Sequence, residues 1–149
     1  MRQGYSFLYD PAVPDFDWRV PLAVMDGDCA LCAFGARVID RLDRVKEIRI
    51  ATIDTALGRA LLEHCGLRAS APDSWLFIED GVAYEGFDAL ICVGRRTGGL
   101  GHGLRLLGAL PQPLRAWLYG WIARNRYRFF GRRRMCDLPS DSLRARLVG

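Results

Sequence analysis

Cys29 and Cys32, separated by two residues, form the most specific chemical pattern in this chain. An apolar run at 20–25 predicts a buried strand, Asp26 and Asp28 lie in the turn after it, and helical spacing of apolar residues begins at Cys29. A Cys-x-x-Cys pair in this position is typical of dithiol–disulfide exchange. Because a thiolate attacks the disulfide, the protein must lower a thiol pKa from its ordinary value of about 8.5.

The start of the expected helix supplies that effect. Unpaired backbone N–H groups and the positive end of the helix dipole favour an anion at Cys29. Cys32 lies one turn later, close enough to form an internal disulfide and release a substrate. We therefore assign Cys29 as the attacking thiol and Cys32 as the resolving thiol, and we expect both to be open to solvent. Asp26 and Asp28 either oppose the thiolate by their charge, or one of them accepts the proton of Cys32.

The other cysteines and the histidines form no second cluster. Cys65 and Cys92 lie in apolar helical contexts and are expected in the core, whereas Cys136 follows three arginines and is either a reactive or a structural thiol. A zinc site needs about four ligands, and no second Cys-x-x-Cys or His pair is present. We expect no metal ion and no organic cofactor, and we expect His64 and His102 at the surface or in loops.

Hydrophobic periodicity predicts the order strand, helix, strand, helix, strand, strand, helix. The expected strands are 20–25, 47–53, 74–78 and 82–84, and the expected helices are 29–43, 55–65 and 87–96. A helix after each of the first two strands predicts a parallel βαβ unit, and Asp80-Gly81 predicts an antiparallel hairpin. The fold class is therefore α/β, with a thioredoxin-like mixed sheet flanked by helices.

A helical C-terminal extension is expected to follow this core. We divide the chain into an N-terminal lead-in (1–19), a thioredoxin-like core (20–97), and a Gly-rich linker with a basic amphipathic helical extension packed on the core (98–149). The main helix of the extension is expected at 113–130. We expect Trp117, Trp121 and Phe129 to pack against the sheet and the arginines to lie in water.

The composition agrees with one globular domain. The chain has 149 residues, of which 50% are hydrophobic and 26% charged, so wholesale disorder is excluded. No apolar run approaches the ~18–20 residues that span a bilayer, and the N-terminus lacks the basic start and apolar stretch of a signal peptide. We expect a cytoplasmic protein without a disulfide framework.

The net charge of +4 is unevenly distributed. Residues 1–80 carry 13 acidic and 9 basic side chains, whereas residues 81–136 carry 2 acidic and 10 basic ones. The basic extension leaves a non-enzymatic alternative open, a binding module that contacts a membrane surface through its Trp, Tyr and Arg side chains. Nucleic-acid binding is less favoured, because the chain has no recognised nucleic-acid module.

The segment Asp26-Gly27-Asp28-Cys29-Ala30-Leu31-Cys32 resembles the signature of the DCC family of thiol-disulfide oxidoreductases, named for Asp-x-x-Cys-x-x-Cys. The resemblance covers about residues 20–139 and includes 84–90 and 119–131. It implies a thioredoxin-like fold and exchange with a disulfide-containing protein or small thiol, carried by Asp26, Cys29 and Cys32. A reducing cytosol favours the reductase direction. Unlike thioredoxin, the chain has Ala-Leu between its cysteines, and whether the bond before Pro72 is cis stays open.

Asp26 and Asp28 also fit a second enzyme class. Haloacid-dehalogenase-like phosphatases begin with an apolar strand and Asp-x-Asp, where one carboxylate attacks phosphorus and the other acts as acid and base beside Mg²⁺. Val24-Met25-Asp26-Gly27-Asp28 meets this minimal pattern. The only lysine is Lys46, and Glu79-Asp80 is a poor candidate for the later acidic cluster.

Overall fold

A five-stranded sheet forms the centre of the computed structural model, which describes residues 5–67, 75–132 and 141–148. The strands are β1 (Leu22–Met25), β2 (Arg49–Thr52), β3 (Leu76–Glu79), β4 (Val82–Glu85) and β5 (Leu147–Val148), in the order β4-β3-β1-β2-β5. All four residues of β1 are apolar and buried, as expected for a central strand whose two faces are both covered.

The connections follow the predicted plan. β1 pairs with β2 in parallel, with α1 (Ala30–Leu42) as the crossover, and β3 pairs antiparallel with both β1 and β4. Asp80 and Gly81 make the β3–β4 turn with φ of 49° and 75°, the two left-handed positions that such a tight hairpin requires. The α/β, thioredoxin-like prediction is therefore confirmed.

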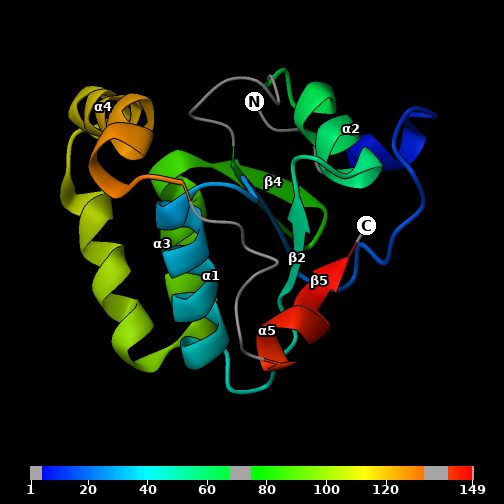
Figure 1. Ribbon diagram of the computed structural model, residues 1–149, viewed down its shortest axis with the longest axis horizontal. Helices are drawn as coiled ribbons and strands as arrows, with labels where there is room; N and C mark the ends of the chain where they lie inside the picture. Colours follow the sequence, from blue (N-terminus) through cyan, green and yellow to red (C-terminus); the bar gives the residue numbers. More distant parts are fainter. Residues whose placement is uncertain (1–4, 68–74, 133–140, 149) are drawn as a thin grey trace.

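Helices cover the two faces of the sheet unequally (Figure 1). α1, α3 (Gly86–Thr97) and α4 (Gln112–Phe130) lie on one side, with the 3₁₀ segment η2 (Gly99–Ala109) packed on α3. α2 (Ala56–His64) and the N-terminal segment with η1 (Ser6–Tyr9) lie on the other. Each side has its own cluster of buried apolar residues, and Cys32 packs against the cluster under α1 and α3.

The chain after α3 is more regular than expected. Most of the predicted Gly-rich linker forms η2, and the last described residues form α5 (Asp141–Arg146) and β5, which pairs parallel with β2. The expectation that the aromatic side chains of α4 pack against the sheet is wrong, because Trp117, Trp121 and Phe129 are 60%, 43% and 61% exposed. Of the described helices, none is long and apolar enough to cross a membrane.

Two other groups of side chains take on structural roles. His64 does not lie free at the surface: it is half-buried, and its two ring nitrogens hydrogen-bond Ser6 and Asp10 at 2.8 and 2.6 Å, so it ties the N-terminal segment to α2.

Cys92 is buried, as predicted. Burial and its hydrogen bond to Glu79 raise the pKa of this thiol to about 12, which makes it unreactive.

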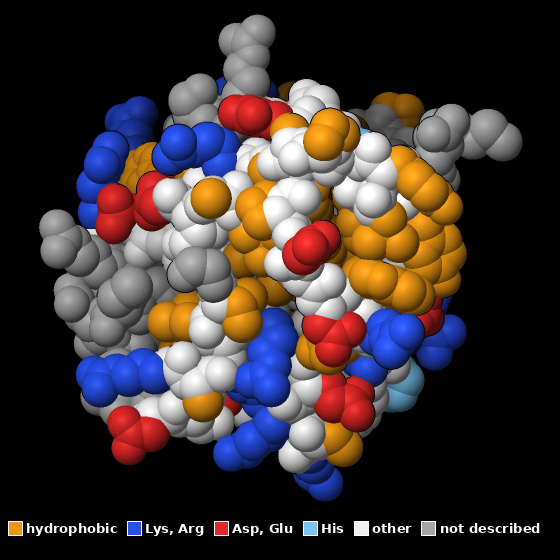
Figure 2. Space-filling view, turned by 90° about the vertical axis from the view of Figure 1, so that its right-hand side faces the viewer, with side chains coloured by type: hydrophobic (Ala, Val, Ile, Leu, Met, Phe, Trp, Pro, Cys, Tyr) orange, Lys and Arg blue, Asp and Glu red, His pale blue; other side chains and the backbone are white. Residues whose placement is uncertain are grey.

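The face that carries α2 and β5 has a largely apolar cavity of about 620 Å³ (Figure 2). Its lining includes Phe16, Leu22, Leu57 and Val148, and Arg49 is the one basic side chain among the described residues that line it. These apolar residues belong to or pack against the cluster on the α2 side of the sheet, whereas Cys32 packs on the opposite side. This cavity is therefore separate from the cysteine pair.

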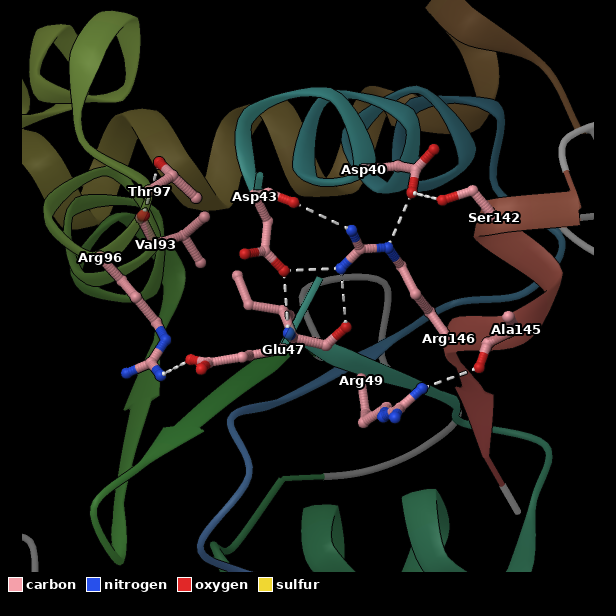
Figure 3. Close-up of polar contacts among 11 residues, drawn as sticks. Asp40, Asp43, Glu47, Arg49, Val93, Arg96, Thr97, Ser142, Ala145 and Arg146 are labelled. Carbon is pink, nitrogen blue, oxygen red and sulfur yellow. Dashed lines mark hydrogen bonds and ion pairs between the residues drawn. The ribbon is translucent and has the colours of Figure 1, made fainter. Parts of the chain in front are cut away.

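Arg146 fastens the C-terminal segment to the core (Figure 3). Its side chain is 2% exposed and contacts Asp40 at 2.7 Å and Asp43 at 2.6 Å, and it also donates to the carbonyl of Ile48 at 3.0 Å. Asp43 also accepts a hydrogen bond from the Ile48 N–H at 2.9 Å. The guanidinium thus joins the end of α1, the start of β2 and α5 in one buried network.

Replacing Arg146 with Ala should lower the free energy of unfolding by about 3–5 kcal/mol, because the Asp43 carboxylate would stay buried without its cation. Urea denaturation measures the change. Arg59→Ala, at an exposed site on α2, is the matched control and should cost less than about 1 kcal/mol. Equal losses in the two variants would contradict a stabilising role for the network.

Candidate functional site

The cysteine pair lies at the start of α1, after the short turn that follows β1. Cys29 is the N-cap residue, with φ −91° and ψ 125°, and α1 begins at Ala30. Its carbonyl accepts the first helical hydrogen bond from the Ala33 N–H at 2.9 Å, so Cys32 follows within the first turn. Both cysteines are free thiols, and their side chains lie close enough to shift each other's pKa. The two sulfurs are therefore placed together at the positive end of a helix.

Access to this pair differs from the sequence-based expectation. Cys32 is partly exposed, but Cys29 is 0% exposed, so the expectation that both thiols are open to solvent is wrong for Cys29. Part of its cover is the chain just after α4. Gly131 ends that helix with φ 75°, its carbonyl accepts from the Ala30 N–H at 3.3 Å, and Arg132 makes an antiparallel β-bridge with Cys29.

The two thiols have opposite acidities. The pKa of Cys29 is lowered to about 6, and the hydrogen bond from Cys32 is the largest cause; burial opposes the shift, and the charge of Arg126 contributes to it. The same hydrogen bond, together with burial, raises the pKa of Cys32 far above its ordinary value. At neutral pH the pair therefore holds one proton, on Cys32, and Cys29 is a thiolate.

A buried ion pair lies beside the thiols. Asp26 and Arg126 are 4% and 5% exposed, and Arg126 Nη2 lies 2.9 Å from Asp26 Oδ2. The Tyr127 hydroxyl donates to the same Oδ2, and Asp26 Oδ1 accepts from the Asp28 N–H at 2.9 Å. Both carboxylate oxygens of Asp26 are thus engaged, whereas Asp28 is exposed. The residues alone left the roles of the two aspartates open, and the resemblance pointed to Asp26; in the structure Asp26 is the one that lies buried beside the thiols.

Arg126 links this ion pair to the cysteines. Its Nη1 lies 3.7 Å from Cys32 Sγ, within reach of a weak hydrogen bond to sulfur. Its guanidinium also stacks on the Tyr127 ring at 4.9 Å, and Arg132 stacks on that ring at 4.8 Å. Because Tyr127 contacts both arginines, the segment that covers Cys29 is linked to the ion pair between Asp26 and Arg126.

Arg126 and Tyr127 were not singled out from the sequence, where they appear only inside the segment 119–131. A signal was present, because Tyr119, Ala123 and Arg126 recur at helical spacing on the side of α4 that faces the core. An arginine on a buried helix face needs a charged partner, and Asp26 at the end of a buried strand is the residue that supplies it.

The arrangement favours dithiol chemistry over the phosphatase alternative. A phosphatase would need Asp26 free to attack phosphorus, but this carboxylate is bonded to Arg126 and Tyr127. Across the described residues, no group of three or more His, Cys, Asp or Glu side chains could hold a metal ion. Cys136 and Pro72, whose roles the sequence left open, lie outside the described residues.

Comparison with known proteins agrees with the geometry. Residues 23–132 match the DCC1-like thiol-disulfide oxidoreductase family. The uncharacterised protein YuxK of Bacillus subtilis is 36% identical over 132 residues, which cover 87% of this chain and 96% of YuxK. A chloroplastic DCC family protein of Arabidopsis thaliana is 29% identical over 119 residues, covering 79% of this chain and 69% of that protein. No solved structure gives a significant match.

The matched region contains the turn with Asp26, both cysteines, and α4 with Arg126, so the family match spans the whole site. The chain belongs to the DCC family of thiol-disulfide oxidoreductases.

Proposed function

We propose that this oxidoreductase exchanges its dithiol for a disulfide of a protein or small-thiol partner, with Cys29 attacking and Cys32 resolving. The observation that carries the proposal is the pair of neighbouring free thiols at the start of α1, with one thiol favoured as an anion. The family to which the chain belongs supports the general reaction.

The exchange has two steps. The Cys29 thiolate attacks one sulfur of the partner disulfide, the S–S bond breaks, and the other sulfur leaves as a thiolate. Cys32 then passes its proton to the partner thiolate released in the first step or to water, and attacks Cys29 Sγ. The Cys29–partner S–S bond breaks, and the second partner sulfur leaves as a thiolate. The partner gains two electrons, and the protein keeps a Cys29–Cys32 disulfide that a dithiol donor must reduce.

The first step prepares the second. The Cys32 pKa is high chiefly because its thiol hydrogen-bonds the Cys29 thiolate. Once Cys29 is bonded to the partner, that anion is gone, and the nearby Arg126 charge favours the Cys32 thiolate. Asp26 holds Arg126 in this position, so in this scheme it acts through the arginine.

Attack also requires the cover to move. Because Cys29 is fully buried, a partner sulfur reaches it only after the Gly131–Arg132 bridge separates from Cys29. A backbone bridge of this kind has few hydrogen bonds to break, among them the one from Ala30 to Gly131. We infer that partner docking displaces this segment.

The pKa of about 6 predicts the pH dependence of alkylation. The rate at which iodoacetamide labels Cys29, followed by site-resolved mass spectrometry, should rise through pH ~6 and level off above it, because only the thiolate reacts. An ordinary cysteine gives a midpoint near ~8.5. A Cys29 midpoint at this ordinary value would contradict its assignment as the thiolate.

Arg126 variants test the electrostatic part of that pH dependence. Arg126→Gln should move the midpoint of Cys29 to higher pH, because Arg126 lowers this pKa by its charge. Arg126→Lys keeps the positive charge and should therefore retain most of the lowered Cys29 midpoint. Comparison of the two variants separates the loss of charge from any loss of stability in Arg126→Gln. Arg124→Gln changes an exposed arginine two residues away and should leave the midpoint unchanged.

Trapping in cells tests the order of attack. Cys32→Ser cannot resolve the intermediate, so it should accumulate mixed disulfides through Cys29, visible as adducts on non-reducing gels. Cys29→Ser is the matched control and should form none. Adducts of equal abundance in both variants would show that Cys29 is not the attacking thiol.

For the direction of exchange we propose reduction of the partner in a cytoplasmic setting. Stabilising the Cys29 thiolate stabilises the dithiol form and raises the reduction potential, which works against a reductase. The cytosolic glutathione pool has a potential of about −220 to −260 mV by extraction methods. We therefore expect the reduction potential of the Cys29–Cys32 pair to lie only slightly below that of the pool. Equilibration with glutathione buffers measures it, and a value near ~−120 mV would show an oxidant instead.

A further inference from the structure

The outward side of α4 has a composition unusual for a water-exposed helix surface. Opposite the buried Ala123 and Arg126, the helix exposes five residues that we call the outer face: Leu114, Trp117, Trp121, Arg124 and Arg128. Its apolar members are 46%, 60% and 43% exposed, in chain order. Exposed apolar side chains that line up along one helix face mark a surface that binds something.

The aromatic character continues past the outer face. The Phe129 ring lies 5.8 Å from the Trp121 ring and is 61% exposed, and Phe130 is 53% exposed. α4 lies at the outside of the molecule, away from the sheet (Figure 1). In the described parts of the chain, no other helix exposes two tryptophans.

The sequence around this helix carries charge of one sign, and the acidic partners of its inner side, Asp88 at Arg115 and Asp26 at Arg126, come from other elements. Between Asp88 and Asp137 the sequence contains ten arginines and no acidic residue. Arg124 and Arg128 place two of these charges on the outer face itself, next to the aromatic rings. A surface of this kind complements a partner that is anionic and also accepts apolar side chains.

We propose that the outer face of α4 docks on an anionic lipid bilayer, with its arginines at the headgroup phosphates and its tryptophans at the headgroup–acyl boundary. Tryptophan and arginine are the side chains that suit this region. A single-stranded nucleic acid would satisfy the arginines and stack its bases on the tryptophans, but it would leave the exposed Leu114 without a partner. The apolar half of the face therefore favours lipid.

This docking would place the redox pair close to the membrane. Arg126, on the opposite side of the same helix, contacts Cys32, so roughly one helix diameter, about 10 Å, separates the pair from the lipid surface. If the proposed exchange is correct, its partners are disulfides near a membrane surface. The docking itself does not depend on the cysteines.

Co-sedimentation with phosphatidylcholine vesicles, with and without phosphatidylglycerol, tests the proposal on the full chain. The protein should bind the anionic vesicles, bind neutral ones weakly, and lose affinity as salt rises. Trp117→Ser/Trp121→Ser should abolish most of the binding. Arg124→Gln/Arg128→Gln should weaken it by about fivefold for each arginine.

Matched controls separate the face from general charge and from the redox reaction. Arg41→Gln/Arg44→Gln removes the same charge from exposed sites on and after α1 and should leave binding nearly unchanged. Cys29→Ser should bind vesicles as the unmodified protein does, whether or not exchange occurs. Equal binding by the tryptophan variant, or binding to a single-stranded oligonucleotide in preference to anionic vesicles, would overturn the proposal.

Discussion

The buried ion pair between Asp26 and Arg126 is the interaction on which the site depends. It joins the turn after β1 to α4, two segments a hundred residues apart in the chain, and both partners are almost fully out of water. Each charge alone would be costly there, so each holds the other in place. The pair thereby fixes α4 over the start of α1 and brings a positive charge to Cys32.

The same constraint explains the division of labour between the cysteines. The helix start, the thiol–thiol hydrogen bond and Arg126 all favour charge at the pair, but only one of the two sulfurs can carry it. Cys29 carries it because Cys32 donates to it. In the proposed exchange, Arg126 would therefore act on the cysteine pair while Asp26 holds it in place, although neither residue bonds to the partner.

Local patterns predicted the parts of the fold that local physics determines. The apolar run of β1, the helical spacing of α1 and the Asp80-Gly81 turn each depend on neighbours in sequence, and all three were found close to their expected bounds. β5 and the pairing of Arg126 with Asp26 depend on contacts between distant segments: helical spacing can place Arg126 on a helix face, but it does not identify the partner of that arginine. The orientation of α4 was misjudged because its apolar residues occur on both sides, so Trp117 gave no indication of which side faces the core.

Burial of Cys29 has a further consequence, for selectivity. Thiolates are oxidised by peroxide to sulfenic and then to irreversible sulfinic and sulfonic acids, and susceptibility follows both charge and exposure. The Cys29 sulfur is anionic at neutral pH but buried behind Gly131 and Arg132. It therefore has the charge that favours oxidation without the exposure that oxidation requires. Small oxidants and alkylating agents reach the sulfur only while the bridge is transiently open, so they should react more slowly than they would with an exposed thiolate. In the proposed exchange, a partner that opens the bridge on docking would react preferentially.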